Sequence, residues 1–153
     1  MQISEYIRDD LILLDLKAQD KAEAIRKLID LLQQRGVVKD PDDFFREVME
    51  REKLGSTAVG HGVALPHART EKLDDIVVAV GRCAEGVDFG ADDGQPVHMI
   101  FLIGTPPSEV NRYLKLLAGL SRLLRQQQVR EAIMSASSES EVREALMDAQ
   151  QVS

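Results

Sequence analysis

The chain has 153 residues, of which 44% are hydrophobic and only 4% aromatic, and it contains no tryptophan. A chain of this length buries roughly 70% of its unfolded surface, so we expect one domain over residues 1–153 with an aliphatic core. The formal net charge of -7 disfavours a nucleic-acid backbone or an anionic membrane as the main partner, and it favours contact with a basic surface on another protein.

Neither a disulfide framework nor a membrane anchor is predicted. Cys83 is the only cysteine, so neither an intramolecular disulfide nor a cysteine-rich metal site is possible. We interpret it as structural because it follows the run IVVAVGR without a loop that could bind phosphate. The N-terminal stretch MQISEYIRDD lacks a basic region followed by an apolar run, so no signal peptide is predicted. Every apolar run is far shorter than the ~20 residues that span a membrane. We therefore expect a cytoplasmic protein without membrane insertion.

In chain order, a short strand and two amphipathic helices come first. The apolar run LILLDL at 11–16 predicts the strand. Asp20 begins a capping box, in which its carboxylate accepts from the backbone of Glu23, and Asp40 caps the second helix. The apolar residues expected on the buried face of that second helix are Phe45, Val48 and Met49.

A loop and three strands are predicted next. Residues 54–62 are rich in glycine, serine and threonine, which is typical of a loop. The brief strand 63–65 is ended by Pro66. Stronger strands follow at 76–80 and 97–103, and the last is nearly all apolar, as expected for a central strand covered on both faces.

Three helices are predicted in the C-terminal third. A long helix follows GTPPSEV, and two short helices lie around 129–134 and 142–149, with a capping box at 138–141. Helices on both sides of a strand cluster predict an α/β sandwich. We expect a mixed sheet of four or five strands with helices on both faces.

The chain has only three histidines. His98 lies in the predicted central strand, where a residue satisfied within the sheet is the plainest interpretation. His61 lies between two glycines in the loop, either simply exposed or as an electrostatic aid to a site. His67 follows a strand and a proline, so its imidazole is expected just beyond a strand end, where open α/β sheets bind ligands. From spacing alone, a functional His67 and an ordinary surface histidine both stay open.

The stretch GSTAVGHGVALPHAR, residues 55–69, resembles the active-site signature of type-2 enzyme IIA domains. These belong to the fructose/mannitol class of the bacterial phosphoenolpyruvate:sugar phosphotransferase system, which includes nitrogen-regulatory phosphocarriers. Other segments are also similar to family segments, namely ISEYIRDDLILLDLKAQDKAEAIRKLIDLL, VMEREKLGST and GQPVHMIFLIGTPP. The resemblance covers nearly the whole chain and implies a single enzyme IIA domain that serves sugar transport or nitrogen regulation.

The resemblance implies that His67 is the phosphorylated histidine and that Arg51 is the arginine near it. The implied donor is a histidine-phosphorylated carrier of the HPr type, and the implied recipient is a cysteine of an enzyme IIB or a regulated target protein. No cofactor or metal is required, because the phosphoryl group passes from side chain to side chain.

The residue types suit these roles. A histidine nucleophile must be neutral, and a reference pKa of about 6.5 leaves His67 mostly uncharged. Arg51 can make bidentate contacts to phosphoryl oxygens. The loop 55–62 can turn backbone N–H groups toward them, while Ser56 and Thr57 can add hydroxyls. Without the resemblance, a surface arginine and two turn residues would be the simpler interpretation.

Several positions depart from the family pattern. Ala58 and Ala68 stand in place of glycines, which reduces backbone freedom, and His61 stands where asparagine or an acid is usual. Tyr113 stands where the family generally has a second histidine. A tyrosine can donate a hydrogen bond to a phosphoryl oxygen but cannot become a cation, which implies slower transfer or a longer-lived phosphohistidine. A core-edge aromatic is the alternative for Tyr113.

Three functional hypotheses follow. In the first, His67 accepts a phosphoryl group and passes it on. In the second, the protein is a non-catalytic regulatory module whose contacts depend on the phosphorylation of His67, since a charge of roughly -2 switches such contacts. The lack of a fused IIB or IIC segment favours this nitrogen-type role. The third is a metal-dependent hydrolase that uses His61, His67 and His98.

The third hypothesis lacks a clustered carboxylate–histidine pattern, so we expect no metal site. For the first two hypotheses, we expect partner docking on an exposed apolar rim formed by Val59, Val63 and Leu65.

Overall fold

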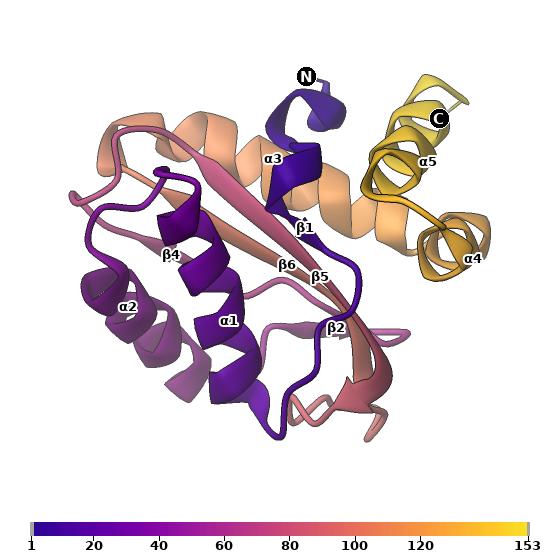
Figure 1. Cartoon of the computed structure of the whole chain (residues 1–153), viewed down its shortest axis with the longest axis horizontal. Coiled ribbons are helices and arrows are strands. Elements are labelled where there is room, and N and C mark those ends of the chain that lie inside the picture. The colour runs from indigo at the N-terminus through magenta and orange to yellow at the C-terminus, as the bar shows by residue number, and fades with distance from the viewer. Residues whose placement is uncertain (1, 153) are drawn as a thin grey trace.

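A mixed β-sheet organises the computed structural model, which describes residues 2–152 (Figure 1). Within this range the sheet has six strands in the order β1-β5-β6-β3-β2, and β4 also pairs with β6. The strands are β1 (Ile12–Leu13), β2 (Ala58–Gly60), β3 (Val63–Ala64), β4 (His67–Arg69), β5 (Val77–Val87) and β6 (Val97–Thr105).

The sheet has more strands than the four or five predicted, because β2 and β4 were not expected. β2 comes from the glycine-rich segment predicted as loop, and it pairs antiparallel with β3. β4 continues the chain beyond Pro66, and both β3 and β4 pair in parallel with β6.

The described part of the chain has five α-helices, which cover both faces of the sheet and confirm the predicted α/β sandwich (Figure 1). One face carries α1 and α2, and the other carries α3, α4 and α5. Across residues 2–152, no helix combines the length and apolar character needed to span a bilayer. The helices are α1 (Lys21–Gln34), α2 (Pro41–Lys53), α3 (Val110–Leu124), α4 (Gln127–Ser135) and α5 (Glu139–Val152).

Local capping explains where three of the helices begin. Asp20 Oδ1 accepts from the backbone N–H of Glu23 at 2.8 Å, and Asp40 Oδ1 accepts from that of Asp43 at 3.1 Å. Before α5, Ser138 Oγ accepts from the N–H of Glu141 at 3.2 Å. These bonds satisfy N–H groups that the first turn of a helix leaves without partners.

Of the three residues predicted for the buried face of α2, only Val48 is fully buried. Phe44 is fully buried, whereas Phe45 and Met49 are only half-buried. The reason lies on β6, where Gly104 has no side chain and a β-carbon would lie 2.6 Å from the Phe44 ring. The face that contacts the sheet therefore runs through Phe44, Val48 and Glu52.

Strand β6 is central, as predicted. Its residues alternate between the two cores, because successive side chains of a strand point to opposite faces. Ile100 and Leu102 pack with α1 and α2, while Phe101 and Ile103 pack with α3 and the C-terminal helices. This doubly covered strand is the rigid element on which β3 and β4 are aligned.

Candidate active site around His67

His67 is positioned by an interruption in the strand ladder. β3 and β4 follow β6 in one direction, and Leu65 and Pro66 separate them. Proline has no N–H to donate, but its carbonyl accepts from Ile103 N at 2.9 Å, so the backbone stays on β6. His67 is thus the first residue of β4 rather than a residue beyond a strand end, and its side chain is half-buried.

The hydrogen bond of the His67 ring fixes its tautomer. Nδ1 lies 2.7 Å from the carbonyl oxygen of Leu65. A carbonyl can only accept, so Nδ1 carries the proton and Nε2 keeps a free lone pair. Burial lowers the pKa of His67, and its net shift is downward although the Leu65 carbonyl and Glu52 oppose it and Arg51 adds to it. The ring is therefore neutral near pH 7.

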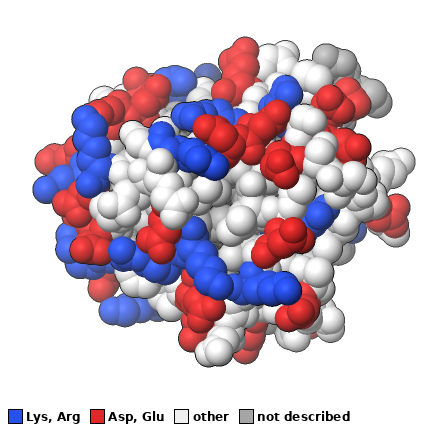
Figure 2. Space-filling view, in the orientation of Figure 1, with Lys and Arg blue, Asp and Glu red and all other residues white. Residues whose placement is uncertain are grey.

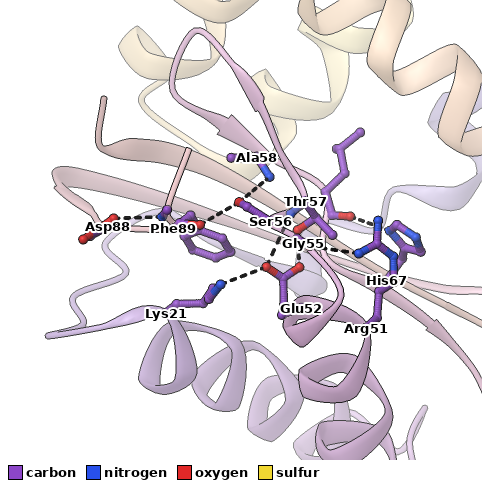
Figure 3. A network of polar contacts seen from close by, with 12 residues as sticks. Lys21, Arg51, Glu52, Gly55, Ser56, Thr57, Ala58, His67, Asp88 and Phe89 are labelled. Carbon is purple, nitrogen blue, oxygen red and sulfur yellow. Dashed lines mark hydrogen bonds and ion pairs between the residues drawn. The ribbon is translucent and has the colours of Figure 1, made fainter. Parts of the chain in front are cut away.

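Arg51 lies beside this ring, on the last turn of α2 (Figure 3). Its Nη1 donates to the carbonyl oxygen of Gly55 at 2.9 Å, which leaves the other guanidinium N–H groups without a hydrogen bond to any described residue. Arg51 and His67 both line two hollows in the surface, of about 340 and 530 Å³. The structure therefore brings these two predicted residues together.

Ser56 and Thr57 line the smaller hollow, but their hydroxyls serve the loop. Ser56 Oγ donates to the carbonyl of Phe89 at 2.6 Å and accepts from Ala58 N at 3.1 Å. Thr57 is buried, and its hydroxyl donates to the Glu52 carboxylate. These three hydrogen bonds hold the glycine-rich segment in place next to His67 (Figure 3).

Glu52 is a residue that the sequence analysis missed. Its side chain is 1% exposed, and Oε1 accepts from Lys21 Nζ at 3.2 Å and from Thr57 N at 3.4 Å. A buried carboxylate is costly unless it is paired and hydrogen-bonded, as it is here. The signal was present, since Glu52 follows Phe44 and Val48 at four-residue spacing on the apolar face of α2. The carboxylate ties the ends of α1 and α2 to the loop.

Tyr113 packs against His67 from α3. Their ring centroids are 6.0 Å apart, with an interplanar angle of 61°. Burial raises the pKa of the Tyr113 phenol, although the nearby charges of Arg69 and Arg51 act to lower it. The hydroxyl therefore stays protonated, and Tyr113 is a neutral donor beside the ring.

His61 lines neither hollow. It lies in the turn between β2 and β3, where His61 and Gly62 have φ of 57° and 76°, as in a two-residue hairpin turn of type I′. Asparagine adopts such backbone angles more easily than most residues. Ala58 and Ala68 have no positive φ, so their replacement of glycine costs no backbone strain.

The remaining histidine is satisfied within the sheet, as expected. His98 Nδ1 lies 2.9 Å from the carbonyl oxygen of Cys83, and Cys83 is buried. Among residues 2–152, no three histidine, cysteine or acidic side chains lie close enough together to hold a metal ion.

The apolar rim differs from the prediction. Val59 is 49% exposed, but Val63 and Leu65 are buried against the core that α3 covers, because β3 lies inside the sheet. Leu54 and Leu114 are the other exposed large apolar side chains among the described residues, and both line the larger hollow together with His67. We define the apolar rim as Leu54, Val59 and Leu114.

The fold and site are those of an α/β protein in which a neutral histidine with a free ring nitrogen lies beside an arginine in an open hollow. Residues 5–149 match the family described as "Phosphoenolpyruvate-dependent sugar phosphotransferase system, EIIA 2", and the chain belongs to this family. The resemblance noted from the sequence is thereby confirmed.

Relatives within the family differ in size. The fructose-specific EIIA component of Haloferax volcanii is 37% identical over 139 residues, which cover 91% of this chain and 90% of that protein. The fructose-specific EIIABC component of Bacillus subtilis is 32% identical over 139 residues, and the match spans only 22% of its length.

Solved structures agree with the fold. The nitrogen regulatory protein IIA-Ntr from Neisseria meningitidis superposes with a TM-score of 0.87 at 35% identity, covering 94% of this chain and 98% of that chain. Mannitol enzyme IIA of Escherichia coli, solved in complex with phosphorylated mannitol enzyme IIB, gives a TM-score of 0.78 at 27% identity, with 92% and 96% coverage. That mannitol enzyme IIA therefore forms a complex with an enzyme IIB.

Proposed function

We propose that this protein is a phosphocarrier in which Nε2 of His67 accepts a phosphoryl group from a histidine-phosphorylated carrier of the HPr type. The group then passes to a cysteine of an enzyme IIB or is kept as a regulatory signal. The observation that carries the proposal is the Nδ1–H bond to the Leu65 carbonyl, which leaves Nε2 as the free nucleophile beside Arg51. Family membership supports the same chemistry.

Transfer of the phosphoryl group to His67 requires no proton to leave the His67 ring. The Nε2 lone pair forms the new N–P bond, while the N–P bond of the donor histidine breaks and its electron pair returns to the donor nitrogen. Nδ1 keeps its proton on the Leu65 carbonyl, so phosphorylated His67 is an imidazolium. A cationic ring is a good leaving group, which keeps the phosphoryl group transferable to a thiolate.

Arg51 supplies the electrostatic part of this mechanism. Phosphoryl transfer depends mainly on positioning and on stabilising the charge on the phosphoryl oxygens. The N–H groups of Arg51 that do not bond Gly55 can donate to those oxygens as the group arrives. The Ser56 and Thr57 contacts keep the loop beside Arg51 in place, so these two residues support the site indirectly.

A regulatory role for the same histidine is favoured by the apolar rim. Leu54 and Leu114 line the hollow that contains His67, so phosphorylation places a charge of roughly -2 inside an apolar docking surface. On the face drawn in Figure 2, basic and acidic side chains are interleaved, so the acidic excess forms no single patch there.

The test is incubation with phosphoenolpyruvate, enzyme I and HPr, followed by detection of an acid-labile, base-stable adduct. We expect the native protein and H98A to be labelled, and H67A to remain unlabelled. Equal labelling of H67A would show that the phosphoryl group is carried elsewhere. A native protein that is never labelled but still binds its partner would overturn this proposal and would support a binding module that acts without phosphorylation of His67.

A further inference from the structure

Arg69 lies on the same side of β4 as His67. Side chains two residues apart on a strand point to the same face, and their positions differ by about 7 Å along the strand. Ala68, between them, is buried in the opposite core with α1 and α2. Arg69 is therefore directed to the side of the sheet where the nucleophile lies.

The larger hollow is lined by the side chains that could contact a group carried on His67. Its volume is about 530 Å³, and His67, Arg51, Arg69 and Tyr113 all line it. The charges of both arginines act on the Tyr113 phenol, which lies against the His67 ring. Two cations and one neutral hydroxyl thus surround the space into which a group on His67 extends.

The Arg69 side chain has no partner among the described residues. Within residues 2–152, its exposed side chain makes no hydrogen bond and no ion pair. The two carboxylates that also line the hollow come from α2, and one of them, Glu50, is paired with Lys53 at 3.0 Å. The other is Glu47, which makes no ion pair with Arg69. The guanidinium N–H groups of Arg69 are therefore available to an incoming anion.

We propose that Arg69 is a second phosphoryl-binding group, which together with Arg51 holds the oxygens of the phosphoryl group carried on Nε2 of His67. This inference rests on the proposed function and adds a residue to its site. The Tyr113 hydroxyl donates a hydrogen bond to the phosphoryl group. The second positive charge comes from Arg69 on β4, and not from a second histidine at the position of Tyr113 on α3. The phosphoryl group, with a charge of roughly -2, is then matched by two guanidinium groups.

A consequence is that Arg69 stabilises the phosphorylated state. A solvent-exposed ion pair changes an equilibrium by up to about fivefold. Removing the Arg69 charge should therefore shift phosphoryl exchange toward the donor, so that less of this protein is phosphorylated at equilibrium. It should also raise the pKa of the phosphoryl group, because a nearby cation favours its doubly charged form.

The experiment compares R69Q, R69K and native protein after phosphorylation with phosphoenolpyruvate, enzyme I and HPr. The matched control is R125Q, because Arg125 is also exposed, lines neither hollow and has no side-chain partner in the part of the chain that the structure describes. The readouts are the equilibrium constant for exchange with HPr and the pH titration of the phosphohistidine ³¹P resonance. Neither depends on how fast the donor docks.

We expect R69Q to lose about fivefold in the exchange equilibrium and to titrate at higher pH. R69K should keep part of both effects, and R125Q should match the native protein. If R69Q equals the native protein in both readouts, or R125Q changes as much, Arg69 does not bind the phosphoryl group. A native protein that takes up no label would instead overturn the proposed function, and the inference with it.

Discussion

The buried Glu52 carboxylate gives the sharpest test of how the site is built. It accepts from Lys21 Nζ and from both the backbone N–H and the hydroxyl of Thr57, and its side chain is 1% exposed. Glu52→Ala leaves the buried Thr57 groups without their partner. Breaking a buried, charged hydrogen-bond network in this way costs about 3–5 kcal/mol of unfolding free energy.

Glu52→Gln is the milder change. The amide keeps the shape and one acceptor oxygen but loses the charge that pairs with Lys21, which is 25% exposed and can be hydrated instead. We expect a loss of about 1–2 kcal/mol, comparable to one weakened hydrogen bond to a charged group. The assay is urea unfolding, combined with the rate of phosphorylation by HPr measured below the transition.

A double-mutant cycle separates the contact from general destabilisation. Thr57→Val keeps the side-chain volume and removes only the hydroxyl that donates to Glu52. For groups in direct contact, the coupling between E52Q and T57V should be about 1 kcal/mol, and both variants should phosphorylate more slowly because the loop beside Arg51 loosens. Additivity within about 0.3 kcal/mol, or native phosphorylation rates in E52A, would refute this account of the loop.

Three further changes probe the ring and its surroundings. Since burial lowers the pKa of His67, an NMR titration of its Hε1 resonance should give a midpoint below the reference of about 6.5, and phosphorylation should persist at mildly acidic pH. The His67 ring of the unfolded chain binds a proton more readily, so the free energy of unfolding should fall as pH drops below about 6.5. An NMR midpoint above this value would contradict the effect of burial on the His67 pKa. Tyr113→Phe keeps the ring contact and removes the hydroxyl, so phosphorylation should slow by about threefold, in line with one weak hydrogen bond, with little change in melting temperature. Leu114→Asp places a charge on the apolar rim and should weaken the binding of an enzyme IIB, measured by calorimetry, about tenfold. The free energy of unfolding should change by no more than about 0.5 kcal/mol, because the Leu114 side chain is 54% exposed. Unchanged binding would show that the docking surface lies elsewhere.

Local chemistry made much of the fold predictable. The capping carboxylates of Asp20 and Asp40 and the apolar run of β6 each specify structure through contacts with near neighbours, and all were found where expected. The grouping of His67 with Arg51 also followed from the sequence, but through the family resemblance, because spacing alone left His67 open.

The errors came from contacts between distant segments. The missing side chain of Gly104 on β6 leaves space for the ring of Phe44 in the core, so Phe44 is buried instead of Phe45. The sequence pattern of α2 alone does not reveal this space on a distant strand. Val63 and Leu65 are apolar enough for a docking rim, yet their burial depends on α3, which follows much later in the chain. Arg69 was overlooked because β4 was not predicted, and without a strand its alternation with Ala68 carries no meaning.

The hydrogen bond between His67 and the Leu65 carbonyl has a further consequence for how the protein tolerates change. The acceptor is a main-chain atom, so replacing the side chain of Leu65 does not delete it. The orientation of the imidazole therefore depends on the course of the backbone and not on a second titratable side chain. Substitutions of the side chains around His67 can therefore change the choice of partner or the rate of phosphoryl transfer, while Nε2 remains the ring nitrogen with the free lone pair.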